Sequence, residues 1–278
     1  MSKPEEIRHE VAKAYAAAVT APTPKSCCGS APAPKGVAVK LGGYTSAELA
    51  ALPAEAVVNS FGCGNPVALA VLQAGDVVLD LGSGAGIDLL LAAKKVGDGG
   101  RVIGVDMTDE MIAKANENIR AGGFANVEVR KGLIEELPVD SGSIDWVISN
   151  CVINLSPEKA RVFREIARVL KPGGRMLVSD IVARDLPAEV RDVAALYSSC
   201  IGGAISEEEY LAGLRAAGLV DAEVRDRLVY DGDQLAALTG DDLEGACCCG
   251  ASKPLIQAFA RTLAGKVWSA NIYARKPR

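Results

Sequence analysis

Residues 76–88 read DVVLDLGSGAGID, and this stretch decides the fold. Its first part, 76–81, is an apolar run that is typical of a buried β-strand. Glycines then stand at positions 82, 84 and 86, and we expect a turn there that enters a helix ending near Val96. Glycines at such a turn let the backbone approach a ligand closely at the N-terminus of the helix. The stretch therefore predicts a strand, a ligand-binding turn and a helix.

The same alternation continues toward the C-terminus. Strands alternating with helices indicate a parallel sheet joined by right-handed crossovers. We therefore expect an α/β fold: a Rossmann-like, mostly parallel sheet with helices on both faces. The predicted strands lie at 101–106, 126–132, 143–150 and 175–182, and the predicted helices lie at 108–121 and 157–174.

The regions that flank this core have a different character. Residues 3–19 and 46–58 are predicted to be helical, with a Pro-rich linker at 21–36 between them. Residues 183–217 are predicted to be helical and to lie as a lid over the carboxyl edge of the sheet. Strands at 220–230 and 266–276 are expected to form an antiparallel edge. We accordingly divide the chain into an N-terminal helical arm with a cysteine-bearing linker (1–60), a ligand-binding α/β domain (61–182) and a lid and edge-strand region (183–278).

The composition excludes some classes of partner. The chain of 278 residues carries a net charge of -5 and has no basic block, which argues against nucleic acid or an anionic membrane as its main partner. Its apolar runs are too short to cross a bilayer, and its first residues lack a signal-peptide core. These features predict a soluble, cytoplasmic protein.

An acidic residue distinguishes the glycine turn from a dinucleotide site. Asp80 lies two positions before the first glycine, where its carboxylate would repel a pyrophosphate but suits a cationic amino-acid moiety. Asp106 ends the second predicted strand, the usual position of a carboxylate that binds a ribose diol. Over residues 76–182 this pattern resembles the S-adenosylmethionine site of class I methyltransferases. The resemblance implies that the cofactor contacts are Asp80, Gly82, Ser83, Gly84, Gly86, Asp106, Met107, Ile134, Glu135 and Asn150.

Three cysteines that are far apart in the sequence are expected to meet at the same edge. Cys63 lies in a loop before the first strand, Cys151 directly follows the fourth, and Cys200 lies in the predicted lid. Segments that follow parallel strands converge at the carboxyl edge of the sheet. Three thiolates make a poor zinc site, because structural zinc takes four ligands, and the single histidine, His9, is in the N-terminal helix. A soft trivalent ion such as arsenic(III) suits three sulfurs better and keeps a lone pair that can attack a methyl group.

The sequence around these cysteines resembles the arsenite S-adenosylmethionine methyltransferases. The similar segments are FGCGNP around Cys63, SNCVINL around Cys151, SSCIGGA around Cys200, VIGVDMTDEMI and EIARVLKPGG. The resemblance implies that arsenic(III), delivered as a thiol conjugate, is bound by these three cysteines and is methylated. It also implies that an N-terminal cysteine, either Cys27 or Cys28, forms a disulfide with a binding cysteine during turnover, and that glutathione or thioredoxin reduces it.

Two alternatives remain open from the sequence. A class I methyltransferase of a small organic acceptor would need a base or a metal near the acceptor, and none is evident around 150–155. A protein that only sequesters a metalloid with its thiols would not need the Asp80–Gly86 turn. The run Cys247–Cys249 matches none of the three cysteine segments, and we expect it to lie in a loop with exposed thiols.

Overall fold

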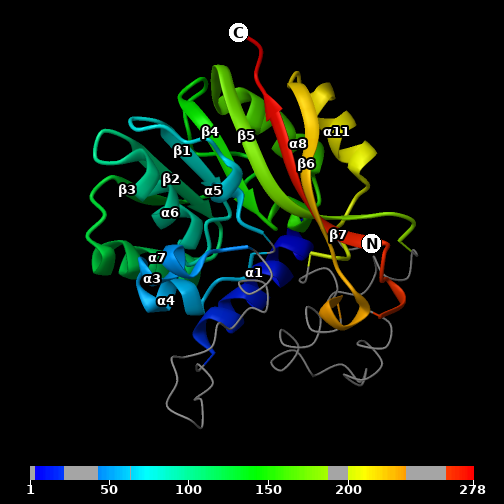
Figure 1. The fold of residues 1–278 in the computed structure, drawn as a ribbon, viewed down its shortest axis with the longest axis horizontal. Coiled ribbons are helices and arrows are strands. Elements are labelled where there is room, and N and C mark those ends of the chain that lie inside the picture. Colours follow the sequence, from blue (N-terminus) through cyan, green and yellow to red (C-terminus); the bar gives the residue numbers. More distant parts are fainter. Residues whose placement is uncertain (1–3, 22–42, 63, 187–199, 236–260) are drawn as a thin grey trace.

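A computed structural model describes residues 4–21, 43–62, 64–186, 200–235 and 261–278 of the chain. These residues build one sheet of seven strands in the order β3-β2-β1-β4-β5-β7-β6 (Figure 1). The first five strands of this order are parallel, whereas β7 runs antiparallel to both β5 and β6. The class I methyltransferase fold predicted from the sequence is confirmed. The strands are β1 (Val77–Leu81), β2 (Arg101–Asp106), β3 (Val127–Lys131), β4 (Ile144–Asn150), β5 (Leu170–Ala183), β6 (Val220–Val229) and β7 (Val267–Arg275).

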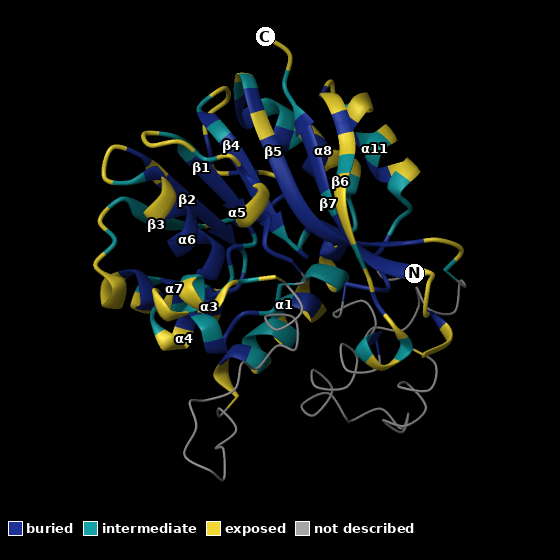
Figure 2. Ribbon diagram, in the orientation of Figure 1, coloured by how far each residue is buried: buried dark blue, intermediate teal, exposed yellow. Residues whose placement is uncertain are grey.

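Helices cover both faces of the sheet. One face packs against α5 (Pro66–Leu69), α6 (Ile87–Val96) and α7 (Asp109–Gly122), and the other packs against α8 (Lys159–Val169) and α11 (Glu207–Ala216). The helix α1 (Pro4–Thr20) lies below the carboxyl ends of the parallel strands (Figure 1). The central strands are buried, and the edge strand β6 is largely exposed (Figure 2).

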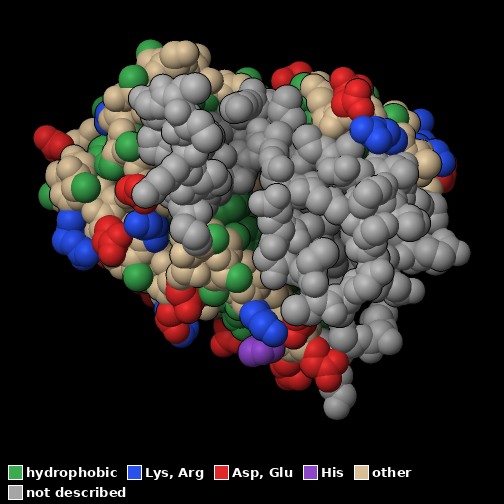
Figure 3. Space-filling model, turned by 90° about the horizontal axis from the view of Figure 1, so that it is seen from below, with side chains coloured by type: hydrophobic (Ala, Val, Ile, Leu, Met, Phe, Trp, Pro, Cys, Tyr) green, Lys and Arg blue, Asp and Glu red, His purple; other side chains and the backbone are tan. Residues whose placement is uncertain are grey.

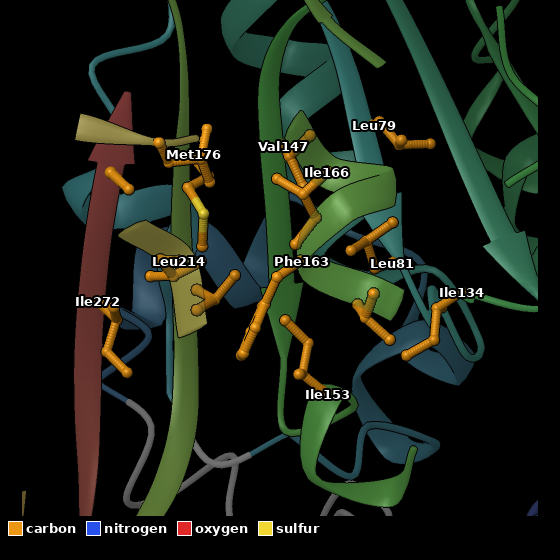
Figure 4. Packing of buried hydrophobic residues seen from close by; sticks show 14 of the residues in the cluster. Leu79, Leu81, Ile134, Val147, Ile153, Phe163, Ile166, Met176, Leu214 and Ile272 are labelled. Atoms are coloured by element: carbon orange, nitrogen blue, oxygen red, sulfur yellow. The ribbon is translucent and has the colours of Figure 1, made fainter. Parts of the chain in front are cut away.

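The helix α8 shows why these residues form a core. Val162, Phe163, Ile166 and Val169 recur at helical spacing, and all four are at most 2% exposed. Figure 4 shows Ile166 beside Val147 of the sheet, whereas the ring of Phe163 packs against Tyr210 of α11, with ring centroids 5.1 Å apart. Burying an aliphatic or aromatic side chain of this size stabilises a fold by about 1.5–3 kcal/mol. The apolar stripe predicted for this helix is therefore what attaches it to the sheet.

Two predicted helices have different bounds in the structure. The helix expected at 46–58 is two short helices, α3 (Ser46–Ala50) and α4 (Ala54–Val58), because Pro53 separates them and disfavours helical backbone at the residue before it. The helix expected to run to residue 174 ends at Val169. Leu170 is already extended and pairs with Ile144 of β4, so that β5 begins five residues earlier than predicted.

The prediction for residues 183–217 is wrong in part. α11 packs against α8 and β6, at the opposite end of the molecule from α1, and so it does not cover the carboxyl edge (Figure 1). Cys200 and Ile201 do lie at that edge, in a buried cluster with Cys151. Residues 187–199 are outside the described part of the chain. The antiparallel edge predicted for β6 and β7 is confirmed, and these strands extend the same sheet as the parallel ones.

Within the described ranges, no helix combines the length and the apolar character that crossing a bilayer requires.

Candidate functional site

The glycine turn after β1 has the backbone that its sequence indicates. Gly82, Gly84 and Gly86 all have positive φ, at 67°, 51° and 97°. Gly82 is also constrained by space, because a Cβ there would lie 2.4 Å from both methyl carbons of Val152. Val152 belongs to the segment after β4. The missing side chain thus lets two strand ends approach each other closely.

Asp106 connects this turn to the end of β2. One of its carboxylate oxygens accepts from the backbone N–H of Gly84, and the other accepts from the backbone N–H of Thr108, both at 2.9 Å. Burial raises the pKa of Asp106, and these backbone hydrogen bonds oppose the rise. The turn and the strand end are therefore held in one arrangement before any ligand binds.

A pocket opens where these elements meet. It has about 950 Å³ of empty space, which includes space open to solvent, and this is large enough for a nucleoside with an amino-acid chain. All ten residues predicted to contact the cofactor line it, although their individual contacts stay predictions. They are Asp80, Gly82, Ser83, Gly84, Gly86, Asp106, Met107, Ile134, Glu135 and Asn150.

The wall of this pocket beside β1 is acidic. Burial raises the pKa of Asp80 well above its ordinary value, and repulsion from Asp88 and then Asp106 adds to the rise. Burial likewise raises the pKa of Asp88 to about 6, while hydrogen bonds from Asn150 and Tyr44 limit it. Buried carboxylates that repel one another are stabilised by a cation and would disfavour an anionic pyrophosphate. The chemistry of the pocket therefore fits a sulfonium and ammonium compound such as S-adenosylmethionine.

A hydrogen-bond network at this end of the pocket was not predicted. The hydroxyl of Tyr44 donates to one oxygen of Asp88 at 2.8 Å, and the amide of Asn150 donates to the other at 3.0 Å. The same amide contacts the Tyr44 oxygen at 3.0 Å. The network joins residues that are 44, 62 and 106 positions apart. Local sequence patterns contain no signal for it.

The helix α1 also lines the pocket. Arg8 donates from Nε and Nη2 to one oxygen of Glu135, each at 3.1 Å, and it also pairs with Glu158. The hydroxyl of Ser156 donates to the same Glu135 oxygen at 2.7 Å. Glu135, expected to lie near the adenine ring, thus also anchors the N-terminal helix. Arg8 was not among the residues predicted to line the pocket.

Two of the three predicted arsenic ligands are described, and they lie together. The thiol of Cys200 donates to the backbone carbonyl oxygen of Cys151 at 2.7 Å, and both residues are 4% exposed. Cys151 is in a disulfide bond. Both residues have positive φ, 59° for Cys151 and 64° for Cys200. Such backbone costs about 1–3 kcal/mol at a non-glycine residue and is found most often at functional sites.

Cys151 is held next to the pocket by its neighbours. Asn150 and Val152, on either side of it, both line the pocket, whereas its own side chain belongs to the adjacent buried cluster. Its backbone N–H donates to the carbonyl oxygen of Ser179 in β5 at 2.8 Å. The side-chain amide of Asn154 donates to the carbonyl oxygen of Ile181. The turn after β4 is therefore fixed onto β5.

The remaining predicted thiols cannot be placed. Cys27, Cys28, Cys63 and the run Cys247–Cys249 lie outside the described residues. Within the described ranges, no three His, Cys, Asp or Glu side chains group as ligands of a metal ion. The three-cysteine site therefore stays a prediction.

The glycines on either side of position 63 pack against the ends of two parallel strands. A Cβ at Gly62 would lie 2.2 Å from the amide nitrogen of Asn150, and a Cβ at Gly64 would lie 2.5 Å from the Cβ of Ser179. The backbone N–H of Gly64 donates to the side-chain oxygen of Asn150 at 3.0 Å. The loop is thus tied to the same strand ends that carry the turn of Cys151.

The face of the molecule below the carboxyl edge carries charges of both signs. In Figure 3 the described Lys, Arg, Asp and Glu side chains are interspersed there, and hydrophobic side chains lie in the hollow between them. The described part of this face therefore presents no block of a single charge.

Comparison with known proteins agrees with this geometry. Residues 72–218 match a family model described as a methyltransferase domain. An arsenite methyltransferase of Halobacterium salinarum is 42% identical over 234 residues, which are 80% of this chain and 59% of that protein. An arsenite methyltransferase of Aquipseudomonas alcaligenes is 45% identical over 185 residues, which are 64% of this chain and 52% of that protein. The chain thus spans between half and three fifths of these relatives.

A solved structure is also similar. The crystal structure of an arsenic(III) S-adenosylmethionine methyltransferase from Chlamydomonas reinhardtii aligns with a TM-score of 0.65 and 34% sequence identity. The alignment covers 87% of this chain and 74% of the algal chain.

Proposed function

The chain belongs to the family of S-adenosylmethionine-dependent arsenite methyltransferases, and from that membership we propose that it transfers a methyl group from S-adenosylmethionine to trivalent arsenic held by cysteine thiolates. One observation carries the proposal. An acid-walled pocket lies directly beside a turn that brings Cys151 and Cys200 into contact. A methyl donor and a soft metalloid would therefore be held next to each other.

The pocket residues bind and orient the methyl donor. Asp80 and Asp88 supply negative charge for a ligand whose sulfonium and ammonium groups are both positive. The carboxylate of Asp106, already aimed by two backbone N–H groups, is positioned to accept from the ribose hydroxyls. S-adenosylmethionine supplies an electrophilic methyl carbon on its sulfonium. Holding donor and acceptor in line would provide about 7–11 kcal/mol of the acceleration in favourable cases.

Glutathione or thioredoxin first reduces the disulfide of Cys151 and frees its thiolate. Trivalent arsenic then enters as a thiol conjugate, and thiol exchange transfers it to Cys63, Cys151 and Cys200. Its lone pair forms a bond to the methyl carbon while the carbon–sulfur bond of the donor breaks. That electron pair stays on the departing thioether, S-adenosylhomocysteine. Arsenic has no proton to lose, so the site needs no general base. Attack by a further thiolate on an arsenic-bound sulfur then returns arsenic to the trivalent state, and the two sulfurs become a disulfide.

A reductant is part of this proposal. We assign the further thiolate to Cys27 or Cys28, and the electrons that reopen the disulfide to glutathione or thioredoxin. A cytoplasmic location would supply these reductants.

The test is arsenic speciation after incubation with arsenite, S-adenosylmethionine and glutathione. Wild-type protein should produce methylated arsenicals, whereas Cys151→Ser and Cys200→Ser should produce none, because a serine hydroxyl is a hard ligand that does not replace a thiolate on arsenic. Both variants should bind S-adenosylmethionine as wild type does in calorimetry. Full activity in both variants would refute the thiolate site. No methylation by wild-type protein, with the cofactor bound, would favour a small organic acceptor instead.

A further inference from the structure

Within the described part of the chain, three buried polar atoms around the pocket have no hydrogen-bond partner. They are Oδ1 of Asn59, Oγ of Ser60 and Oγ of Ser83, and all three residues line the pocket. Only one other buried side-chain atom in the described part of the chain, Oδ1 of Asn154, also lacks a hydrogen-bond partner. Burying a polar group without a partner costs free energy, so an unpartnered group that faces the pocket points to a ligand that satisfies it.

Ser60 is at the acidic end of this pocket. It follows α4 and is two residues from Gly62, whose backbone abuts the side chain of Asn150. Asn150 in turn donates to Asp88. The neighbouring Phe61 packs edge-on against Tyr15 of α1, with ring centroids 6.0 Å apart, which keeps the segment against the pocket. Ser60 itself is 4% exposed.

The charges around the pocket determine what Ser60 can bind. The carboxylates of Asp80, Asp88, Asp106 and Glu135 line it. Among the described lining residues the one cation is Arg8, which is already paired with Glu135 and Glu158. An ammonium group therefore finds several acceptors at the acidic end. A carboxylate would be repelled there unless a neutral donor bound it, and the hydroxyl of Ser60 is an unpartnered donor at this end.

The other two unpartnered atoms are less suited to a carboxylate. Oγ of Ser83 lies 2.6 Å from the point that a Cβ of Gly104 would occupy, so it faces β2. Asn59 donates through Nδ2 to the carbonyl oxygen of Glu55 at 2.8 Å, which leaves its Oδ1 as an acceptor. An acceptor would repel a carboxylate and suits the neighbouring ammonium.

We propose that Ser60 is the residue that recognises the carboxylate of the methionine moiety, and that it orients the amino-acid end of the methyl donor. The inference rests on the proposed use of S-adenosylmethionine. It adds a determinant of specificity: ligands with an intact amino acid are preferred over ligands that lack the carboxylate.

The test compares two ligands that differ only in that carboxylate. Calorimetry should show that Ser60→Ala weakens S-adenosylmethionine binding by about 10-fold or more, as expected for a hydrogen bond to a charged group. The affinity of this variant for decarboxylated S-adenosylmethionine should equal that of wild type. Ser83→Ala is the matched control, because it also removes a buried, unpartnered hydroxyl from this pocket. Any loss in Ser83→Ala should be the same for both ligands.

Thermal unfolding without ligand separates recognition from folding. Removing an unsatisfied buried hydroxyl should leave the unfolding midpoint of Ser60→Ala unchanged or raised. Equal weakening of both ligands, or no weakening of either, would overturn the inference while leaving the proposed function intact. Failure of wild-type protein to bind S-adenosylmethionine would overturn both.

Discussion

At the scale of single residues, Asp106 combines a structural role with a binding role. Its two oxygens accept from Gly84 and Thr108 and so hold the glycine turn against the end of β2. The same carboxylate lines the pocket. Gly82 makes a comparable double contribution, because its positive φ forms the turn and its missing side chain leaves room for Val152. At these two positions, the same atoms shape the glycine turn and the pocket beside it.

Replacing Asp106 should separate these contributions. Asp106→Ala removes two hydrogen bonds to a charged acceptor, each worth about 1.5–3 kcal/mol, together with the predicted ribose contact. We expect S-adenosylmethionine affinity, measured by calorimetry, to fall at least 10-fold, a change of about 1.4 kcal/mol. Asp106→Asn keeps one acceptor oxygen and should lose less. Cofactor affinity that stays at the wild-type value in Asp106→Ala would contradict the assigned contact.

At the scale of elements, α1 connects the N-terminus to the pocket. Arg8, Val11 and Tyr15 of this helix line the pocket, and Arg8 reaches Glu135 on the segment after β3. α1 contributes only two fully buried apolar residues, Val11 and Val19. Its attachment therefore depends strongly on the contacts of Arg8.

Arg8→Ala should loosen this helix. Glu135 is 4% exposed and would keep only Ser156 as a partner, so we expect unfolding free energy to fall by about 1–2 kcal/mol. Amide hydrogen exchange should accelerate in residues 4–20 while the central strands stay protected. The control is Arg161→Ala, whose exposed pair with Glu136 should contribute little to stability. Unchanged exchange in α1 would show that the ion pair does not hold it.

At the scale of the whole molecule, the fold concentrates buried acids at one point. Asp80 is the penultimate residue of β1, Asp88 lies in the first turn of α6, and Asp106 ends β2. Strands β1 and β2 are neighbours in the sheet, and α6 connects them. Three carboxylates are thus brought into mutual repulsion, and this is unfavourable without a cation.

This arrangement predicts a pH dependence. The folded-state pKa of Asp80 is raised and that of Asp88 is about 6, both above the value of about 3.9 expected in the unfolded chain. Between these values the folded protein binds protons that the unfolded chain has lost. The stability that Asp88 contributes is therefore full below about pH 4 and is lost as pH rises through about 6, and Asp80 acts in the same direction. Thermal unfolding of the ligand-free protein, measured at a series of pH values, should show this contribution to the unfolding midpoint decreasing as the pH rises.

The same groups should couple protons to ligand binding. A cationic ligand favours the ionised carboxylates, so the affinity for S-adenosylmethionine should rise as the pH increases through about 6, the pKa of Asp88. Methylthioadenosine, which is neutral and lacks the amino acid, is the matched control and should depend less on pH. Equal pH dependence for the two ligands, measured by calorimetry, would exclude the acidic wall as its source.

Much of the fold and part of the site could be predicted from the sequence. The strand, the glycine turn and the helix at 76–96, and the acids at positions 80 and 106, depend on local requirements: apolar runs for buried strands, and φ above zero for the turn. The predicted ends of helices and strands differ from the structure where tertiary pairing competes with local preference. One example is Leu170, which pairs with β4, so that α8 ends earlier than predicted. The lid prediction failed for α11 because the helix buries Tyr210 against Phe163 of α8.

The sequence by itself determined the α/β alternation, the ligand-binding turn and the family of this protein, because each of these depends on residues within short contiguous segments. Only the tertiary structure decided that Tyr44 and Asn150 hold Asp88, that Arg8 reaches Glu135, and that Cys200 meets the backbone of Cys151. These contacts join residues 44 to 127 positions apart. Their geometry is set by which strands are neighbours and by how the connecting segments pack, and no local pattern encodes it.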